Sequence, residues 1–173
     1  MAISLESKIK KEQVFKTVSV KDSAIDWEKS DIDISEIEDA DDEIEAKKQA
    51  FVKERDCTKL CYKEDDKPTI FVFKHPKSLE SSKIIADIQL KVAGLGAKKG
   101  KGNSPSDLWY ELIDALLLGT AENFIDDYSN IMRDKNTKKV SNEIMAALAE
   151  QNIVAELAGA LLAESNGRDN QKK

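Results

Sequence analysis

The chain of 173 residues can form one domain, or a smaller domain with tails. Its formal net charge of −6 argues against nucleic-acid binding across the whole surface, because proteins bind DNA by neutralising phosphates with Lys and Arg. No apolar run approaches the ~20 residues that cross a bilayer, and the N-terminus lacks an apolar signal core. We therefore expect neither a membrane protein nor a secreted one, and nucleic-acid binding is not expected.

Residues 1–46 are predicted to form an acidic arm that is partly extended or disordered. Gln13–Val20 is enriched in Val, Thr and Phe, which predicts a short strand. In Asp31–Glu45, nine of fifteen residues are acidic and none is basic. Because these charges repel one another, we expect this stretch to be mobile and to become ordered only on a partner.

The isoleucines of this arm alternate with carboxylates, as in acidic segments that dock apolar side chains into a groove with a basic rim. Trp27 stands isolated in a polar segment, so it is either an anchor for a partner or locally packed. A calcium loop starting at Asp31 is not supported, because Glu36 stands where the sharp turn needs Gly. The candidate partner-binding residues of the arm are Trp27, Ile32, Ile34 and Ile37.

Residues 47–102 are predicted to form a helix-strand-helix segment that ends in a Gly/Lys linker. The predicted helix spans Lys47–Tyr62, and the β-branched and aromatic run Thr69–Phe73 predicts a strand. Ser78 is suited to cap the following helix. The stretch Gly94–Pro105 is rich in Gly and Lys and is expected to end that helix as a flexible linker.

Residues 103–173 are predicted to be an amphipathic helical segment with a charged tail. Apolar residues at spacings of three and four predict a first helix that begins at Ser106 or Asp107 and runs through Leu118. Gly119 is expected to end this helix in a left-handed conformation.

Two more helices are expected in this segment. The pattern continues through Phe124–Ile131, which predicts a short helix, and Asn136–Lys139 predicts a polar turn. Ser141 is suited to cap the last helix, which should end at Ser165–Gly167. The fold class expected is therefore α+β and predominantly helical: a small helical domain with one or two short strands and a flexible acidic N-terminal arm.

The reactive side chains do not indicate an active site. Cys57 and Cys61 would lie one turn apart on a helix, but a zinc site needs further ligands and the only histidine is His75. The Gly/Lys linker lacks the phosphate-loop spacing, since Lys101 is followed by Gly102. We assign no catalytic, cofactor-binding or metal-ligating residue and expect no enzyme. The remaining candidate partner-binding residues lie on the strand and the helices: Phe71, Phe73, Trp109, Phe124, Leu157 and Leu161.

Several short motifs occur in a fixed order after residue 67. A strand that starts with Lys-Pro-Thr spans Lys67–Phe73, and a segment with a glycine followed by an aromatic spans Leu116–Phe124. A helix end of the type Leu-x-x-Ser lies in Leu161–Ser165, before the charged stretch Arg168–Asn170. Over residues 67–173 this order resembles a group of small tailed-bacteriophage proteins encoded among virion genes. The resemblance implies an assembly factor, such as a tail assembly chaperone, or a minor structural protein of the particle.

The leading hypothesis is thus a non-catalytic component of bacteriophage particle assembly that binds other phage structural or assembly proteins, or further copies of itself, through apolar helical faces. It would act in the host cytoplasm during assembly, or stay in the virion. The alternative is a cellular adaptor or regulator that docks its acidic, isoleucine-rich segment on a basic groove. A third reading is an enzyme or cation-binding domain that uses the scattered carboxylates.

Overall fold

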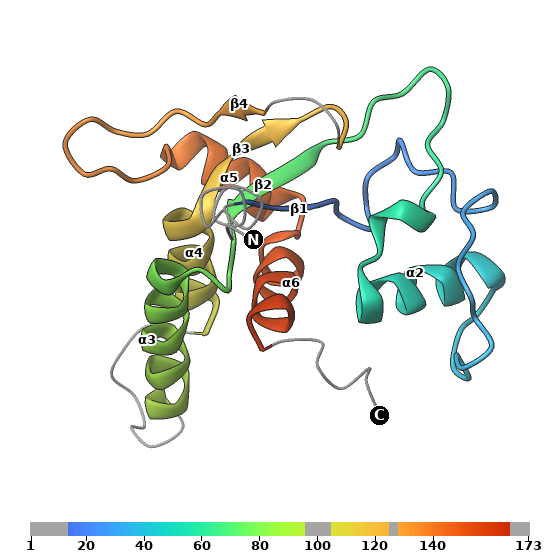
Figure 1. The fold of residues 1–173 in the computed structure, drawn as a ribbon, viewed down its shortest axis with the longest axis horizontal. Coiled ribbons are helices and arrows are strands. Elements are labelled where there is room, and N and C mark those ends of the chain that lie inside the picture. The colour runs from blue at the N-terminus through green and yellow to red at the C-terminus, as the bar shows by residue number, and fades with distance from the viewer. Residues whose placement is uncertain (1–13, 96–104, 125–127, 167–173) are drawn as a thin grey trace, which may run out of the picture.

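A four-stranded antiparallel sheet with the strand order β1-β2-β3-β4 forms the centre of the molecule (Figure 1). The computed structural model describes residues 14–95, 105–124 and 128–166. The strands are β1 (Val14–Thr17), β2 (Ile70–Lys74), β3 (Leu117–Ala121) and β4 (Ser129–Asn130). The fold is α+β, as expected, but the sheet is larger and more central than a predominantly helical fold would have.

Helices surround this sheet. In Figure 1, α3, α4 and α6 lie below the sheet, α5 lies behind it, and α2 lies at the right end of the molecule. The helices are α2 (Glu43–Glu54), α3 (Leu79–Leu95), α4 (Pro105–Leu116), α5 (Asn142–Glu150) and α6 (Val154–Ser165), with a short 3-10 helix at Cys57–Lys59.

The central strand β2 is buried on both faces. Alternate side chains of a strand point to opposite faces, so Phe71 and Phe73 belong to one apolar cluster and Ile70 and Val72 to another. The first cluster is built with α3, α4, α5 and α6, and the second contains Val18, Ile25, Trp27, Phe51 and Leu60. The continuous apolar run Thr69–Phe73 is therefore explained by a strand with a core on each side.

The second cluster corrects the prediction of a partly disordered arm for residues 14–46. Val18 and Ile25 are 0% and 3% exposed, and Trp27 packs edge to face on Phe51 with ring centroids 5.9 Å apart. Lys47 also fixes this segment, because its Nζ donates hydrogen bonds of 3.0 Å to the carbonyl oxygens of Trp27, Glu28 and Ser30. The segment is ordered because it covers the face of the sheet that Ile70 and Val72 would otherwise expose to water.

The helix predicted at Lys47–Tyr62 lies earlier in the chain. The carboxylate of Asp42 accepts a 2.8 Å hydrogen bond from the Glu45 N–H and so caps α2, which begins at Glu43. The helix ends at Arg55, whose φ of 49° is left-handed. Cys57 and Cys61 therefore do not share a helix face, and the prediction that they do was wrong.

The region around Gly119 forms strands where helices were predicted. Helix α4, which was predicted to run through Leu118, ends at Leu116. Gly119 lies inside β3, where it pairs with Val72 and Asn130. A Cβ atom at Gly119 would lie 2.0 Å from the carbonyl oxygen of Ser129, so glycine allows β4 to approach rather than capping a helix. The helix predicted at Phe124–Ile131 is wrong because β4 lies there; residues 125–127 lie outside the described residues.

The remaining predictions are largely confirmed. β2 matches the predicted strand to within one residue, and Ser78 caps α3 by accepting a 3.2 Å hydrogen bond from the Ser81 N–H. Ser141 caps α5 in the same way, through the Ile144 N–H at 3.3 Å. The Gly/Lys linker predicted at Gly94–Pro105 is shorter than expected, because α3 continues through Leu95 and α4 begins at Pro105; residues 96–104 lie outside the described residues.

The predicted last helix is divided in two. Asn152 adopts a left-handed φ of 56°, which separates α5 from α6, and the two helices meet at an angle of 96°. Over the described ranges, no single helix has the length and apolarity to cross a membrane, and α5 and α6 meet those criteria only when they are taken together despite the bend.

Candidate protein-binding site

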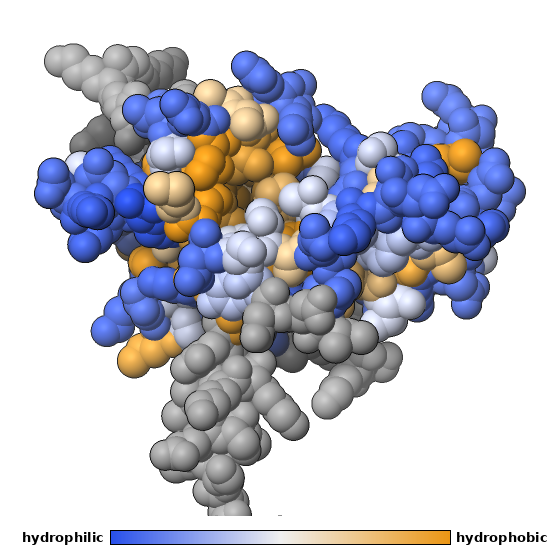
Figure 2. Space-filling view, turned by 90° about the horizontal axis from the view of Figure 1, so that it is seen from above, coloured by the Kyte–Doolittle hydropathy of each residue, from blue (hydrophilic) through white to orange (hydrophobic). Residues whose placement is uncertain are grey.

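An apolar hollow of about 370 Å³ opens between the sheet and α5. Figure 2 looks onto the side of the molecule that carries β4 and shows apolar side chains gathered in a depression with polar side chains around it. Its floor is formed by buried side chains of the first cluster, and its walls are half-buried or exposed. The floor residues are Phe71, Leu117, Leu148 and Ile153, and the wall residues include Ile131, Ile144 and Ala147.

The hollow exists because α5 covers the sheet incompletely. The bend at Asn152 turns α5 away from the direction of α6, and Leu148 is the one buried residue of α5. Ala147 faces the hollow with a side chain too small to fill it. Met132, next to the wall residue Ile131, is 80% exposed. Apolar side chains gathered in a concave surface with a polar rim are typical of binding sites for proteins or ligands.

The rim of the hollow carries one basic and one acidic side chain, Lys21 and Asp22. Lys21 lines it, and its Nζ donates hydrogen bonds of 3.3 and 3.1 Å to the carbonyl oxygens of Gln151 and Asn152. Asp22 also lines it, but its carboxylate accepts the N–H groups of Ala24 at 2.9 Å and Thr69 at 2.7 Å. Much of the acceptor capacity of this one acidic side chain is thus used within the chain.

We call residues 133–139, which follow the wall residue Ile131, the lysine loop. Four of its seven residues are basic and one, Asp134, is acidic. The Asp134 carboxylate accepts N–H bonds of 2.8 Å from Thr137 and Asn136, and these bonds lower its pKa. Arg133 donates to the carbonyl oxygen of Leu117 and, at 2.9 Å, to that of Lys138. These bonds fold the loop so that its three lysines, Lys135, Lys138 and Lys139, remain exposed.

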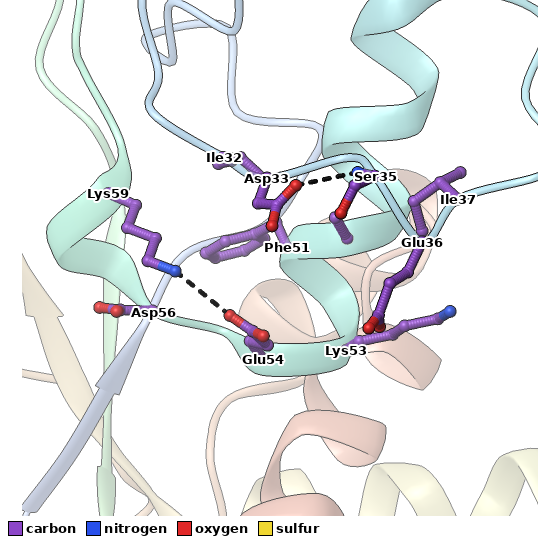
Figure 3. A pocket seen from close by; sticks show the side chains of 11 residues that line it. Ile32, Asp33, Ser35, Glu36, Ile37, Phe51, Lys53, Glu54, Asp56 and Lys59 are labelled. Carbon is purple, nitrogen blue, oxygen red and sulfur yellow. Dashed lines mark hydrogen bonds and ion pairs between the residues drawn. The ribbon is translucent and has the colours of Figure 1, made fainter.

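A second, smaller pocket of about 140 Å³ lies beside α2 (Figure 3). Ile32, Ile37 and Phe51 supply its apolar part. Its charged lining consists of the carboxylates Asp33, Glu36, Glu54 and Asp56 and the amines Lys53 and Lys59. Lys59 pairs with Glu54 at 3.4 Å, so the lining carries an excess of negative charge.

The acidic segment, residues 31–45, thus has a defined conformation beside this pocket. The Asp33 carboxylate accepts a 2.9 Å hydrogen bond from the Ser35 N–H, and this bond lowers the pKa of Asp33. The carboxylates of Glu36, Glu38 and Asp41 belong to exposed residues. Ile34 and Ile37 are half-buried, and Ile44 is 37% exposed. The segment therefore presents acidic groups with isoleucines between them, as its sequence predicts.

A buried polar network joins the acidic end of the molecule to α6. Arg55 Nη2 lies 3.1 Å from Glu156 Oε1, and the two side chains are only 3% and 13% exposed. Glu156 also accepts hydrogen bonds of 2.7 Å from the Ser19 hydroxyl and the Val20 N–H. Arg55 Nη1 donates to the carbonyl oxygen of Val18 at 3.0 Å. The network links α2, the end of β1 and α6.

Half of the partner-binding residues predicted from the sequence lie in the core of the chain. These side chains pack inside the protein and stabilise its fold. At most 8% of each residue is exposed: Trp27, Phe71, Phe73, Leu157 and Leu161. Phe71 contributes to the floor of the hollow. The other half are half-buried: Ile32, Ile34, Ile37, Trp109 and Phe124.

Sequence reasoning missed Lys21, Ile131, Ile144 and Ala147 as members of one site. Ile144 and Ala147 are separated by three residues on one helix, which is a signal for a shared face. Lys21 comes from a distant part of the chain, and no local pattern connects it with α5. The hollow is a product of the tertiary fold.

The two cysteines differ in environment. Cys57 is half-buried, and burial raises the pKa of its thiol, whereas Cys61 is exposed. Because the thiolate is the reactive form, we expect iodoacetamide at about pH 8 to alkylate Cys61 at least about tenfold faster than Cys57. Peptide mass spectrometry over a time course measures both rates, and equal rates would contradict the burial of Cys57.

In the ranges that the structure describes, no three His, Cys, Asp or Glu residues are placed to share a metal ion. His75 packs edge to face on Phe15 at 6.4 Å between centroids, and its Nδ1 accepts the Lys77 N–H at 3.1 Å.

No protein-family model, no curated protein and no solved structure matches the chain. The hollow, the pocket beside α2 and the charges around them are therefore the basis for inferring function.

Proposed function

We propose that the chain is a non-catalytic protein–protein interaction component of bacteriophage particle assembly, either an assembly chaperone or a minor structural protein of the virion. It binds a segment of a phage structural or assembly protein, either another protein or a further copy of the chain itself, in the apolar hollow beside α5. It acts in the host cytoplasm during assembly, and a minor structural protein would remain in the particle. The resemblance over residues 67–173 supports the viral part of this proposal.

The hollow is the observation that carries the binding function. Burying an apolar side chain contributes about 1.5–3 kcal/mol, so each partner side chain that packs on Phe71, Ile131 or Ile144 adds to the free energy of binding. The positive charge of the lysine loop, which follows the wall residue Ile131, favours a partner segment whose apolar residues are flanked by carboxylates, because complementary charges steer association and disfavour basic competitors. The partner segment is thus acidic and carries apolar side chains.

The test uses tagged chain expressed in phage-infected cells, with bound proteins identified by mass spectrometry. Ala147→Asp places a carboxylate in the hollow, and we expect it to reduce capture of the phage partner at least about tenfold, since a buried unpaired charge costs several kcal/mol. Ala146→Asp is the matched control, because Ala146 is also exposed on α5 but does not line the hollow. Equal capture by wild type and both variants contradicts the proposal.

The adaptor function remains the second candidate because the acidic segment presents exposed carboxylates in a defined conformation. An adaptor binds a host protein in uninfected cells, and neutralising Glu36, Glu38 and Asp41 weakens that binding. A phage assembly component captures a different phage protein only after infection, because only then is that protein present. Capture from infected and uninfected cells in parallel separates the two functions.

A further inference from the structure

We propose that the chain binds further copies of itself. The acidic segment of one copy docks in the hollow of the next copy. The inference rests on the proposed function, because it names the partner of the same site. The occupant of the hollow is a second copy of the chain.

The charges of the two surfaces are complementary. Lys21 lines the hollow together with Asp22, and the lysine loop, whose Arg133 donates to the carbonyl oxygen of the floor residue Leu117, carries the exposed Lys135, Lys138 and Lys139. The acidic segment has nine carboxylates and no basic residue. Attraction between such patches accelerates association and sets the orientation of the two molecules.

The apolar parts of the two surfaces are complementary as well. The hollow is lined by Ile131 and Ile144 over a floor of buried side chains, and the neighbouring Met132 is 80% exposed. The acidic segment has Ile34 and Ile37 half-buried and Ile44 37% exposed between its carboxylates. Contact between these residues removes apolar surface of both copies from water.

The positions of the surfaces favour a contact between molecules over a contact within one molecule. The lysine loop and the acidic end around α2 lie at opposite ends of the long axis in Figure 1. One molecule therefore does not satisfy its own lysine loop with its own acidic segment. Two different surfaces that bind each other join the copies head to tail in chains or rings, or side by side and antiparallel in a twofold dimer that forms both contacts.

Sedimentation analysis of the full chain over a concentration series tests this contact. We expect the wild type to associate, with an association constant that falls as salt is raised because the charges are exposed. Two charge-reversed variants, Lys135→Glu/Lys138→Glu/Lys139→Glu and Glu36→Lys/Glu38→Lys/Asp41→Lys, should each weaken association at least about tenfold. Mixed in equal amounts, the two variants should associate again, because each supplies the charge that the other lacks.

The matched control is Lys63→Glu/Lys77→Glu/Lys83→Glu, which changes the net charge equally at three exposed lysines outside the loop and the hollow. It should associate more strongly than the loop variant and should gain nothing from the acidic-segment variant. Ala147→Asp should also abolish association, and Ala146→Asp should not. A wild type that stays monomeric up to about 1 mM, or association that neither charge reversal nor Ala147→Asp changes, overturns the inference. If the wild type is monomeric while Ala147→Asp still loses a phage partner, the proposed function stands without self-association.

Discussion

Replacing Arg55 with methionine should lower the free energy of unfolding by about 3–5 kcal/mol, measured by urea denaturation. The guanidinium is 3% exposed and neutralises Glu156 at 3.1 Å. Its removal leaves the Glu156 carboxylate largely buried without a cationic partner and deprives the Val18 carbonyl of a hydrogen-bond donor. The loss is large because the network joins three segments that are distant in sequence.

The control for this prediction is Lys67→Met. Lys67 pairs with Glu122 at 2.8 Å, but the two side chains are 73% and 69% exposed, so water screens the pair and its loss should cost less than about 1 kcal/mol. The double variant Arg55→Met/Glu156→Gln should lose less free energy of unfolding than the two single variants lose together, since it leaves no unpaired charge. A cost of Arg55→Met as small as that of Lys67→Met would show that the network is not buried in solution.

Replacing Gly119 with alanine should lower the free energy of unfolding by about 3 kcal/mol. The added Cβ would lie 2.0 Å from the carbonyl oxygen of Ser129 and 2.9 Å from its carbonyl carbon. Because both contacts are with backbone, β4 must move away from β3. The movement would weaken the bonds that join β4 and the following Ile131 to β3.

Gly159→Ala is the matched control for this substitution. Gly159 lies in α6, and a Cβ there meets nothing within 4 Å. Alanine should stabilise the helix by about 0.5–1 kcal/mol, since glycine is entropically unfavourable inside a helix. Thermal unfolding of both variants shows whether each substitution raises or lowers the stability of the protein. Stabilisation by Gly119→Ala would mean that β4 does not pair with β3.

Local sequence patterns predicted the elements whose signals are local. The strand at Thr69–Phe73 and the caps at Ser78 and Ser141 each depend on residues within a few positions of one another, and all three are confirmed. Gly119 was misread because a glycine after an apolar helical run is typical of a helix end. The approach of Ser129, ten residues later, decides its role here.

The acidic segment was misread for a related reason. Its charge density predicts disorder when the stretch is considered alone. Its flanks are held by distant contacts, chiefly Trp27 on Phe51 and Lys47 on three carbonyl oxygens. The hollow was not predictable either, because it combines β2, β3 and α5 with Lys21.

Capture of a phage partner by the Ala147→Asp variant, compared with Ala146→Asp and wild type, tests most directly whether the hollow is the binding site. The partner's abundance relative to the tagged chain is the quantity to measure, by mass spectrometry of material from infected cells. Wild type and Ala146→Asp should retain the same phage structural or assembly protein, and Ala147→Asp should lose it at least about tenfold. Retention of that protein by a folded Ala147→Asp variant would contradict a role for the hollow in binding.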